Sequence, residues 1–365
     1  MSERKKVLIG LSGGVDSATA VHFLNASGFD VIGLTLKMLP DAIEKVCSAG
    51  EGFRVCCSKE AVMEARICAM KLGIPHYVIN CSGDFEDKVI RYFIEDYLAA
   101  KTPNPCVFCN KFIKFKYLLK YAAMMGIDFV ATGHYADIKY SEKYGMKLFC
   151  KPADADRDQS YMLSMLPREY IEKIILPLGP YAKSETRAYA EKLGLIVANK
   201  PDSQEICFIP DGDYAGFIMA DEKNLSAVKP GNIVTADRKI LGRHNGLINY
   251  TIGQRKGLNI AHKTPLYVIR LDRERNEVVV AEASAAEKSE FFVKDINWHP
   301  EAPLTPGYAY GVKIRYKHTE AAAELTPLAG GRASVKLHKP ERGVTPGQIL
   351  AVYDGEFLLG GALIE

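Results

Sequence analysis

Two stretches of the sequence carry residues whose types and spacing could do chemistry. The first is the glycine-rich stretch SGGVDS at residues 12–17, which follows an apolar run at 7–11 and precedes a helix-like segment. Glycines let backbone N–H groups converge on an oxyanion, and a helix dipole adds about half a positive charge there. Because the stretch lacks the Gly-Lys-Ser/Thr ending of a Walker A loop, pyrophosphate is the better expected ligand. A glycine turn capped by Asp16 or Ser17 is the alternative interpretation.

The second set of reactive residues consists of cysteines. Cys106 and Cys109 form a C-x-x-C pair in TPNPCVFCNKFIKFK, which we predict to be a proline-ordered loop before a lysine-rich helix. Because a helix N-terminus lowers a thiol pKa, Cys109 is expected to be nucleophilic. Half of a zinc site or a redox pair would also fit, but no second pair follows to complete a zinc site. Cys207 stands in EICFIP, where a buried core thiol is the commoner interpretation. The other six cysteines are expected to be packing or incidental thiols.

Length and composition limit the class of protein. A chain of 365 residues is too long for one ordinary core and indicates two or three domains. The charged start of the chain is not followed by an apolar segment, and no run of about 18 apolar residues occurs. We therefore expect neither a membrane span nor export, and a cytoplasmic location. Nine cysteines, an odd number, favour thiols, metal ligation or catalysis over a disulfide framework.

The basic residues are unevenly distributed, although the net charge is only +3. Residues 101–120 contain five lysines and no acidic residue, and residues 238–263 contain six lysines and arginines and no acidic residue. Such segments suit a polyanion, and Phe112 and Tyr250 are nearby rings on which bases could stack. A solvated basic face is the alternative interpretation.

The elements that must position these residues alternate between strand and helix. The expected strands are 7–11, 29–38, 76–81 and 129–134, and the expected helices between and after them are 59–73, 84–98 and 111–125. This alternation predicts an α/β fold with a doubly wound parallel sheet. Ligands of such sheets bind at the carboxyl ends of the strands, where residues 12–17, 36–38 and 133–135 would emerge.

The second half of the chain has a different pattern. A charged hairpin is expected at 137–151 and a helix at 183–194, and short β-like runs separated by turn residues follow residue 210. These runs predict one or two small antiparallel β modules, the last a barrel. We expect an α/β catalytic domain at 1–210, a small β-rich domain at 211–285, and a C-terminal β-barrel at 286–365.

Eight motifs in a fixed order give the sequence a specific resemblance. They are SGGVDS, TPNPCVFCN with IKF, ATGHYA, DQSYML, DSQEICFIP, YTIGQRKGL, the Arg315–Tyr316 pair and TPGQ. SGGVDS resembles the loop of the ATP pyrophosphatase family, whose members cleave ATP to AMP and pyrophosphate. The whole set resembles the bacterial tRNA-specific 2-thiouridylases, and the resemblance spans nearly the whole chain.

The resemblance implies a reaction and a nucleotide site. ATP would adenylate O2 of the wobble uridine of a tRNA, so that sulfur can replace this oxygen and give 2-thiouridine. The residues implied for ATP are Gly10, Leu11, Ser12, Gly13, Gly14, Val15, Asp16, Ser17, Leu36 and Gly133. Mg²⁺ would offset the phosphate charge, with Asp16 as its nearest protein neighbour. Leu36 stands where the family usually has methionine.

The resemblance also implies the sulfur chemistry and the RNA contacts. Cys207 would carry a persulfide received from a sulfur-relay or cysteine desulfurase protein, and Cys109 would help release the sulfur, leaving a disulfide between the two. The residues implied for tRNA contacts are Asn104, Pro105, Cys106, His134, Arg157, Asp158, Gln159, Arg315, Tyr316 and Gln348. Cys106 replaces an aspartate common in the family. Cys106, Cys109 and Cys207 could instead ligate a four-iron four-sulfur cluster, and this alternative stays open.

Two other function classes are weaker interpretations. An amidotransferase-type synthetase that adenylates a small acid would need a glutaminase domain or a small-molecule pocket, and the basic segments do not fit it. A non-catalytic RNA-binding protein with a degenerate nucleotide fold is disfavoured by the intact SGGVDS. Turnover of ATP with bound tRNA would discriminate these classes.

Overall fold

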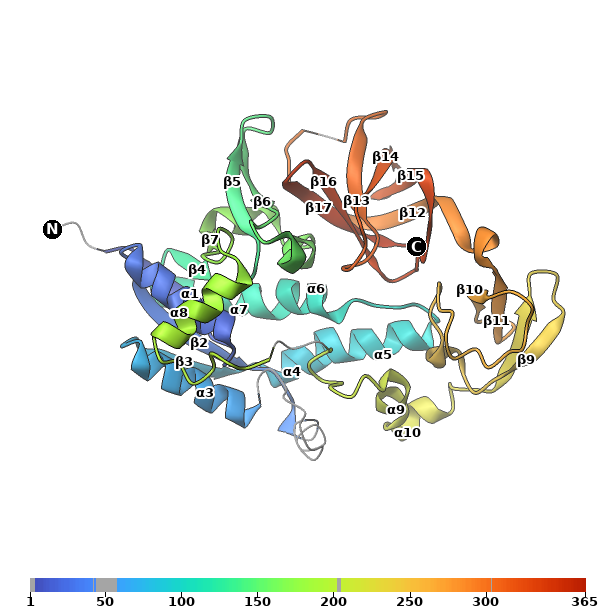
Figure 1. The fold of residues 1–365 in the computed structure, drawn as a ribbon, viewed down its shortest axis with the longest axis horizontal. Coiled ribbons are helices and arrows are strands. Elements are labelled where there is room, and N and C mark those ends of the chain that lie inside the picture. The colour runs from blue at the N-terminus through green and yellow to red at the C-terminus, as the bar shows by residue number, and fades with distance from the viewer. Residues whose placement is uncertain (1–3, 42, 44–57, 202–204, 303) are drawn as a thin grey trace.

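The computed structural model describes residues 4–41, 43, 58–201, 205–302 and 304–365. It has an α/β part, a small central β part and a C-terminal barrel, with long helices running from the first part beneath the barrel (Figure 1). Cys47, Cys56 and Cys57, which we predicted to be incidental thiols, lie outside the described residues. Among the described residues, no helix has the length and apolarity that a bilayer crossing needs.

The α/β part is built on a parallel sheet, as predicted. Its strands pair in the order β3-β2-β1-β4-β7, and all neighbours are parallel. The strands are β1 Lys6–Gly10, β2 Asp30–Lys37, β3 His76–Asn80, β4 Phe129–Ala131 and β7 Ile174–Ile175. The chain adds strands on one side of β1 as far as β3 and then returns to its other side with β4. The carboxyl ends of β1 and β4 therefore form the topological switch point, where α/β sheets bind ligands.

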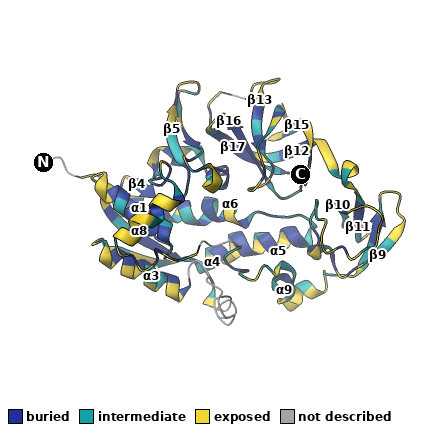
Figure 2. Cartoon of the chain, in the orientation of Figure 1, coloured by how far each residue is buried: buried dark blue, intermediate teal, exposed yellow. Residues whose placement is uncertain are grey.

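Helices cover both faces of this sheet because β1 is apolar on both. Val7 and Ile9 belong to the core with α1 (Val15–Ala26) and α3 (Lys59–Lys71). Leu8 faces the opposite core, which contains residues of two long helical stretches. These stretches are α4 Ser82–Phe85, η1 Glu86–Ile90 and α5 Arg91–Leu98, and then α6 Pro105–Cys109, η2 Asn110–Lys114 and α7 Phe115–Met124. β1 and β2 are mostly buried, whereas the edge strand β3 is largely exposed. Figure 2 shows exposed residues along α3 and α8 (Lys183–Lys192) on the outside of the α/β part.

The second of these stretches begins earlier than predicted. We expected a loop through Cys106 and Cys109 and a helix from Lys111, but the helix begins at Pro105. Asn104 caps it by accepting a hydrogen bond from Val107 N at 3.3 Å, and Pro105 occupies the first helical position. Proline is favoured there because that position needs no N–H donor. The prolines that suggested a loop are thus the start signal of the helix.

The central part contains short helices and a mixed sheet. The helices are α9 Tyr214–Met219 and α10 Glu222–Leu225, and the strands are β8 Gly231–Thr235, β9 Ile240–His244, β10 Leu266–Asp272 and β11 Glu277–Glu282. The strands pair in the order β10-β11-β8-β9. The expectation of a purely antiparallel module is wrong here, because β11 pairs with β8 in parallel.

The C-terminal part is a barrel, as predicted. Its strands are β12 Glu287–Trp298, β13 Ala309–Lys313, β14 Ala321–Leu328, β15 Arg332–Arg342, β16 Ile349–Asp354 and β17 Phe357–Ile364. They pair in the order β12-β15-β14-β13-β16-β17, and a β12–β17 pairing closes the barrel. Gly360, at φ +138°, sits at this closure, where a Cβ atom would lie 2.0 Å from Asn297 O.

The predicted hairpin at 137–151 exists but belongs to two parts of the protein. It consists of β5 (Asp137–Ser141) and β6 (Met146–Cys150) and leaves the α/β part directly after the β4 loop. β6 then pairs with β17 of the barrel through Cys150 and Phe357. The barrel is therefore joined to the α/β part by backbone hydrogen bonding as well as by the chain itself.

Candidate active site

The phosphate loop joins β1 to α1 at the switch point. Its backbone is tied to β2, because Leu11 N donates to Leu34 O at 2.9 Å and Thr35 Oγ1 donates to Leu11 O at 2.8 Å. Gly14, in an extended conformation, is the N-cap of α1. A glycine has no side chain with which to cap, and the first N–H groups of a helix have no partner within it. The start of α1 therefore offers backbone donors to an anion.

Ser17 braces the loop. Its Oγ accepts a hydrogen bond from Ser12 N and donates one to Gly14 O, both at 3.2 Å. Asp16 lies in the first turn of α1 and its carboxylate is held by Lys183. Neither Asp16 nor Ser17 caps α1, whose N-cap is Gly14, although Ser17 does bridge the glycine turn.

The glycines of the site differ in what a side chain at each position would contact. A Cβ atom on Gly13 (φ +71°) would lie 2.3 Å from Ala61 O of α3, and one on Gly133 would lie 2.7 Å from a backbone nitrogen in α1. These two glycines allow the close approach of neighbouring backbone. A Cβ atom on Gly14 would lie 3.4 Å from Ser12 Oγ, which is ordinary contact. We expected both loop glycines to leave room for an oxyanion, and in the structure this argument applies to Gly14.

The apolar members of the predicted nucleotide set contribute backbone or walls. The side chains of Leu11 and Val15 are buried in the cores that flank α1. Leu36 is buried at the end of β2, and Gly10 is half-buried against Leu118. Specific polar contact with a ligand must come from other residues.

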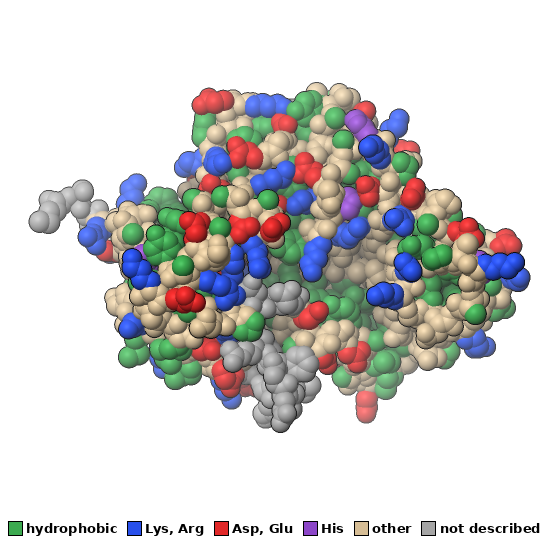
Figure 3. Space-filling model, in the orientation of Figure 1, with side chains coloured by type: hydrophobic (Ala, Val, Ile, Leu, Met, Phe, Trp, Pro, Cys, Tyr) green, Lys and Arg blue, Asp and Glu red, His purple; other side chains and the backbone are tan. Residues whose placement is uncertain are grey.

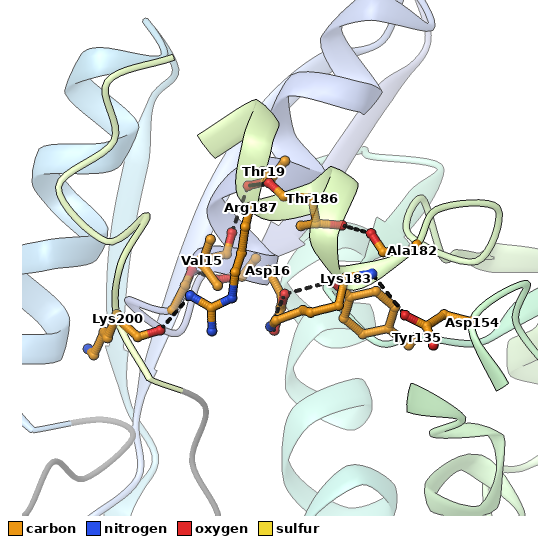
Figure 4. A network of polar contacts seen from close by, with 12 residues as sticks. Val15, Asp16, Thr19, Tyr135, Asp154, Ala182, Lys183, Thr186, Arg187 and Lys200 are labelled. Carbon is orange, nitrogen blue, oxygen red and sulfur yellow. Dashed lines mark hydrogen bonds and ion pairs between the residues drawn. The ribbon is translucent and has the colours of Figure 1, made fainter. Parts of the chain in front are cut away.

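Two lysines from distant parts of the chain reach this loop. Lys183 Nζ lies 2.6 and 2.8 Å from the two carboxylate oxygens of Asp16. Lys200 Nζ donates to Gly13 O at 3.0 Å and forms an ion pair with Glu64 of α3. Figure 4 shows Lys183 extending from α8 (Lys183–Lys192) toward Asp16. The loop has no lysine of its own, but the fold supplies two.

Cys109, in α6, packs beside the end of β2, the strand next to β1. Its Sγ is 3.8 Å from Met38 Sδ, just beyond β2, and the residue is buried. Burial and the nearby Cys109 raise the pKa of Cys81 to about 12, so Cys81 stays a thiol. Cys109 is the fifth residue of its helix, whereas Cys106 is the second and is exposed. The helix-terminus argument that we applied to Cys109 therefore fits Cys106 better.

Cys207 is half-buried beside a buried aromatic residue. Phe208 packs against Phe85 and Phe93, with ring centroids 5.9 and 5.3 Å apart, respectively. Cys207 contacts the same hydrophobic core that contains Cys109. The interpretation of Cys207 as a buried core thiol is therefore met only in part, because Cys207 packs against the core but is half-buried.

The cluster alternative can be compared with this geometry. In the part of the chain that the structure describes, no three side chains of His, Cys, Asp or Glu come together as a metal site. Cys106 is exposed while Cys109 is buried within the same helix. The three cysteines proposed as cluster ligands thus do not form a preassembled set of three corners.

Several predicted RNA contacts gather around Tyr316. Burial raises the pKa of its phenol, Asp158 raises it further, and Arg157 opposes them. Asp158 is itself paired with Lys313 at 2.7 Å and is a brace between the α/β part and the barrel. Arg157 and Arg315 are exposed. Lysine and arginine side chains border the hollow in the middle of the face shown in Figure 3.

Gln348 contacts the protein itself. Its Nε2 donates to Thr102 O at 3.0 Å, and Thr102 N donates to Pro346 O at 2.9 Å. The TPGQ turn of the barrel thus holds the segment that leads into Asn104 and the cysteine helix. Gln348 therefore supports the start of the cysteine helix.

His134 follows β4 and faces the cysteine helix. Its Nδ1 lies 2.8 Å from Thr132 Oγ1, and its ring stacks with Phe115 at 5.9 Å between centroids. Burial and the charge of Lys114 lower its pKa to about 3. His134 is therefore a neutral imidazole at physiological pH and cannot serve as a cation.

Comparison with known proteins follows this geometry. Residues 5–211 match the family described as tRNA methyl transferase HUP domain, residues 223–282 the tRNA methyl transferase PRC-barrel domain, and residues 288–364 the aminomethyltransferase beta-barrel domain. The chain is 44% identical over 362 residues to the tRNA-specific 2-thiouridylase MnmA of Acetivibrio thermocellus, covering 99% of each chain. It is also 44% identical to MnmA 1 of Thermoanaerobacter sp., covering 100% of this chain and 99% of the relative.

The chain belongs to the tRNA-specific 2-thiouridylase family. Among solved structures, an NMN synthetase from Francisella tularensis matches 60% of this chain and 73% of its own at 18% identity, with a TM-score of 0.31. That score is too low to add to the assignment.

In this 2-thiouridylase-family chain, the sequence missed residues that connect the predicted ones. Tyr135 OH donates to Asp16 at 2.9 Å, and its backbone N donates to Gln159 Oε1 at 2.9 Å. Tyr135 thus ties the DQSYML motif to the phosphate loop. Lys183 and Lys200 were also missed. Lys200 lies two residues before the start of the DSQEICFIP motif, but its position at the loop depends on a contact between residues 187 positions apart.

Proposed function

We propose that this protein is an ATP-dependent tRNA-uridine 2-sulfurtransferase that replaces O2 of the wobble uridine by sulfur. One observation carries the proposal: the phosphate loop after β1 and the thiol of Cys109 beside the end of β2 lie at the carboxyl edge of one sheet. Adenylation and sulfur transfer act on the same uridine, so their groups must lie on one site. We place the reaction in the cytoplasm, where thiols stay reduced.

ATP would lie on the phosphate loop. The N–H groups at the start of α1 would hold phosphate oxygens, with Gly14 leaving room for them, and Leu36 and Gly133 would flank the adenosine. Mg²⁺ prefers oxygen ligands, and the Asp16 carboxylate, 31% exposed, fits as one of them. When bound, Mg²⁺ would supply charge neutralisation to the phosphates. Attack of uridine O2 on the α-phosphorus would give adenylated uridine and pyrophosphate.

The tRNA would approach across the exposed arginines. Arg157 and Arg315 would contact backbone phosphates, and Tyr316 offers a ring for a base that has left the anticodon stack. Unstacking a base costs a few kcal/mol, which these contacts would have to offset. The acid-free segment 238–263 provides further positive charge on the central part.

Sulfur would be transferred by the two cysteines. The terminal sulfur of a Cys207 persulfide would attack C2 of the adenylated uridine, and AMP would leave with the former O2. The thiolate of Cys109 would then attack Cys207 Sγ, so that the sulfur stays on C2 as a thiocarbonyl and a Cys109–Cys207 disulfide forms. A thiol reductant would reopen the disulfide, and a sulfur-relay or cysteine desulfurase protein would renew the persulfide. We derive no step through an iron-sulfur cluster, because Cys106 and Cys109 face different surroundings.

The test is tRNA thiolation by iron-free protein. Purified protein supplied with a cysteine desulfurase, cysteine, MgATP and substrate tRNA should form 2-thiouridine and release pyrophosphate, measured by nucleoside analysis and by a coupled pyrophosphate assay. Cys207→Ser should stop thiolation while pyrophosphate release continues. Pyrophosphate release that is independent of tRNA would favour a small-molecule synthetase. Activity that appears only with bound iron would restore the cluster alternative.

A further inference from the structure

Lys183 is a buried charged residue that the proposed reaction has not used. Its side chain is only 8% exposed, and its ammonium contacts both carboxylate oxygens of Asp16. Asp16 is in the first turn of the helix that follows the phosphate loop. The cation therefore lies within the nucleotide site.

The position of Lys183 is fixed by contacts on several sides. It is the first residue of α8, and its backbone N donates to Asp154 at 2.9 Å. The residue before it is held by Glu185, whose carboxylate accepts from Ala182 N at 2.8 Å. The ammonium lies 5.5 Å from the ring centroid of Tyr135, whose hydroxyl also contacts Asp16. Figure 4 shows this group between α8 and α1.

The ion pair between Lys183 and Asp16 is not explained by folding stability alone. A carboxylate at the start of a helix is already favoured by the helix dipole. A buried ion pair is weak evidence for a role in stability, because desolvation offsets much of the attraction. A nucleotide site that binds pyrophosphate without a lysine in its loop needs a cation, and Lys183 brings one to 2.6 and 2.8 Å from the carboxylate oxygens of Asp16.

We propose that Lys183 is the phosphate-binding lysine that the loop SGGVDS lacks. In the structure its ammonium neutralises Asp16. With MgATP bound, Asp16 would help hold the metal, and the Lys183 ammonium would contact the β- and γ-phosphates, where charge develops as pyrophosphate leaves. This role rests on the proposed use of ATP. It makes the affinity for ATP depend on the same lysine that forms the ion pair with Asp16.

The experiment compares ATP with AMP, which lacks the two phosphates in question. Lys183→Met should weaken MgATP binding about 10- to 100-fold, the loss expected for one charge-assisted hydrogen bond, while AMP affinity changes by less than about threefold. Lys183→Arg should recover part of the difference. Lys192→Ala, at the exposed end of the same helix, is the control and should bind both nucleotides as the parent does. Calorimetry gives the affinities, and a melting curve shows whether each variant is folded.

A double variant distinguishes a direct contact between Lys183 and phosphate from an indirect effect of leaving the Asp16 charge unpaired. Asp16→Asn with Lys183→Met removes both charges, so no unpaired carboxylate remains. If Lys183 contacts phosphate, the double variant should bind ATP about tenfold or more weakly than Asp16→Asn alone. Equal ATP affinity of these two proteins, or equal losses for ATP and AMP in Lys183→Met, would overturn the inference. Parent protein that releases no pyrophosphate with tRNA would instead contradict the proposed function.

Discussion

At the scale of single residues, the two cysteines of the C-x-x-C pair lie in different surroundings. Cys106 is exposed on the second position of its helix, and Cys109 is buried against Met38. A thiol that reacts within a closed site must be shielded from water. An exposed side chain, by contrast, can be substituted with little effect on packing. The structure therefore shows a difference in burial between the two cysteines that their spacing did not reveal.

The first prediction follows from this difference. Cys106→Asp should retain most of the thiolation rate, because it places the family's common residue at an exposed position. Cys109→Ser should reduce thiolation by at least about 1,000-fold, since a hydroxyl cannot replace the attacking thiolate. The measurement is 2-thiouridine formed per unit time by iron-free protein. Comparable losses in both variants would indicate that the two thiols act together.

A second residue-scale prediction concerns His299, which is fully buried where the barrel meets the β6 hairpin. Its Nε2 lies 3.1 Å from Leu166 O, and burial lowers its pKa from 6.5 to about 4. In the unfolded chain the His299 imidazole binds a proton more readily than in the folded protein. The free energy of unfolding therefore falls as the pH falls from about 6.5 toward 4.

The loss attributable to His299 is up to about 3 kcal/mol in the free energy of unfolding. His299→Gln should flatten this dependence in urea unfolding measured between pH 7 and 4. His338→Gln, an exposed histidine of β15, is the control and should keep the parent slope. An unchanged slope in His299→Gln would assign the acid sensitivity to other groups, His134 among them.

At the scale of elements, sequence patterns predicted the sheet well and the start of the cysteine helix poorly. β1 is apolar on both faces and needs no long-range information to be recognised as a central strand. Asn104 and Pro105 are common to turns and to helix starts, and only the helical residues after them decide between the two. The lysines of the phosphate site could not be predicted, because their role depends on contacts between α1, α8 and the segment after α8.

The cap of the cysteine helix gives an element-scale prediction. Asn104→Ala should lower the free energy of unfolding by about 1 kcal/mol, because Val107 N loses its acceptor. Asn104→Asp should retain the cap and the stability. Urea unfolding followed by circular dichroism measures both. If Asn104→Ala also slows thiolation more than its loss of stability explains, the cap positions Cys109 as well as the helix.

At the scale of the whole molecule, the proposed RNA surface crosses from the barrel to the central part. A Cβ atom on Gly253 would lie 3.1 Å from Gly343, so the loop of YTIGQRKGL touches the barrel. Arg315 Nη1 donates to Arg342 O beside the same contact. The exposed Lys256 and Arg315 are thus brought toward one surface by elements far apart in the sequence.

Salt dependence tests this surface. Arg315→Ala combined with Lys256→Ala should weaken tRNA binding and reduce the slope of log affinity against log salt by up to about two counterions. A fluorescence titration at several salt concentrations gives the slope. Arg332→Ala, which removes a cation paired with Glu365 on the barrel, is the control and should leave the slope unchanged. A double variant with the parent slope would place the RNA elsewhere.

The hairpin that leaves the α/β part and pairs with β17 has a consequence for synthesis of the chain. Lys139 of β5 forms an ion pair with Glu356, 217 positions later, and β6 pairs with the final strand. On the ribosome the hairpin is therefore made long before its partner strand β17. During this interval the edge of the hairpin has no partner strand, and such edges are sites of wrong pairing between chains. The hairpin carries Lys139, Lys143 and Lys147, and charge of this kind would keep nascent chains apart until β17 has been made.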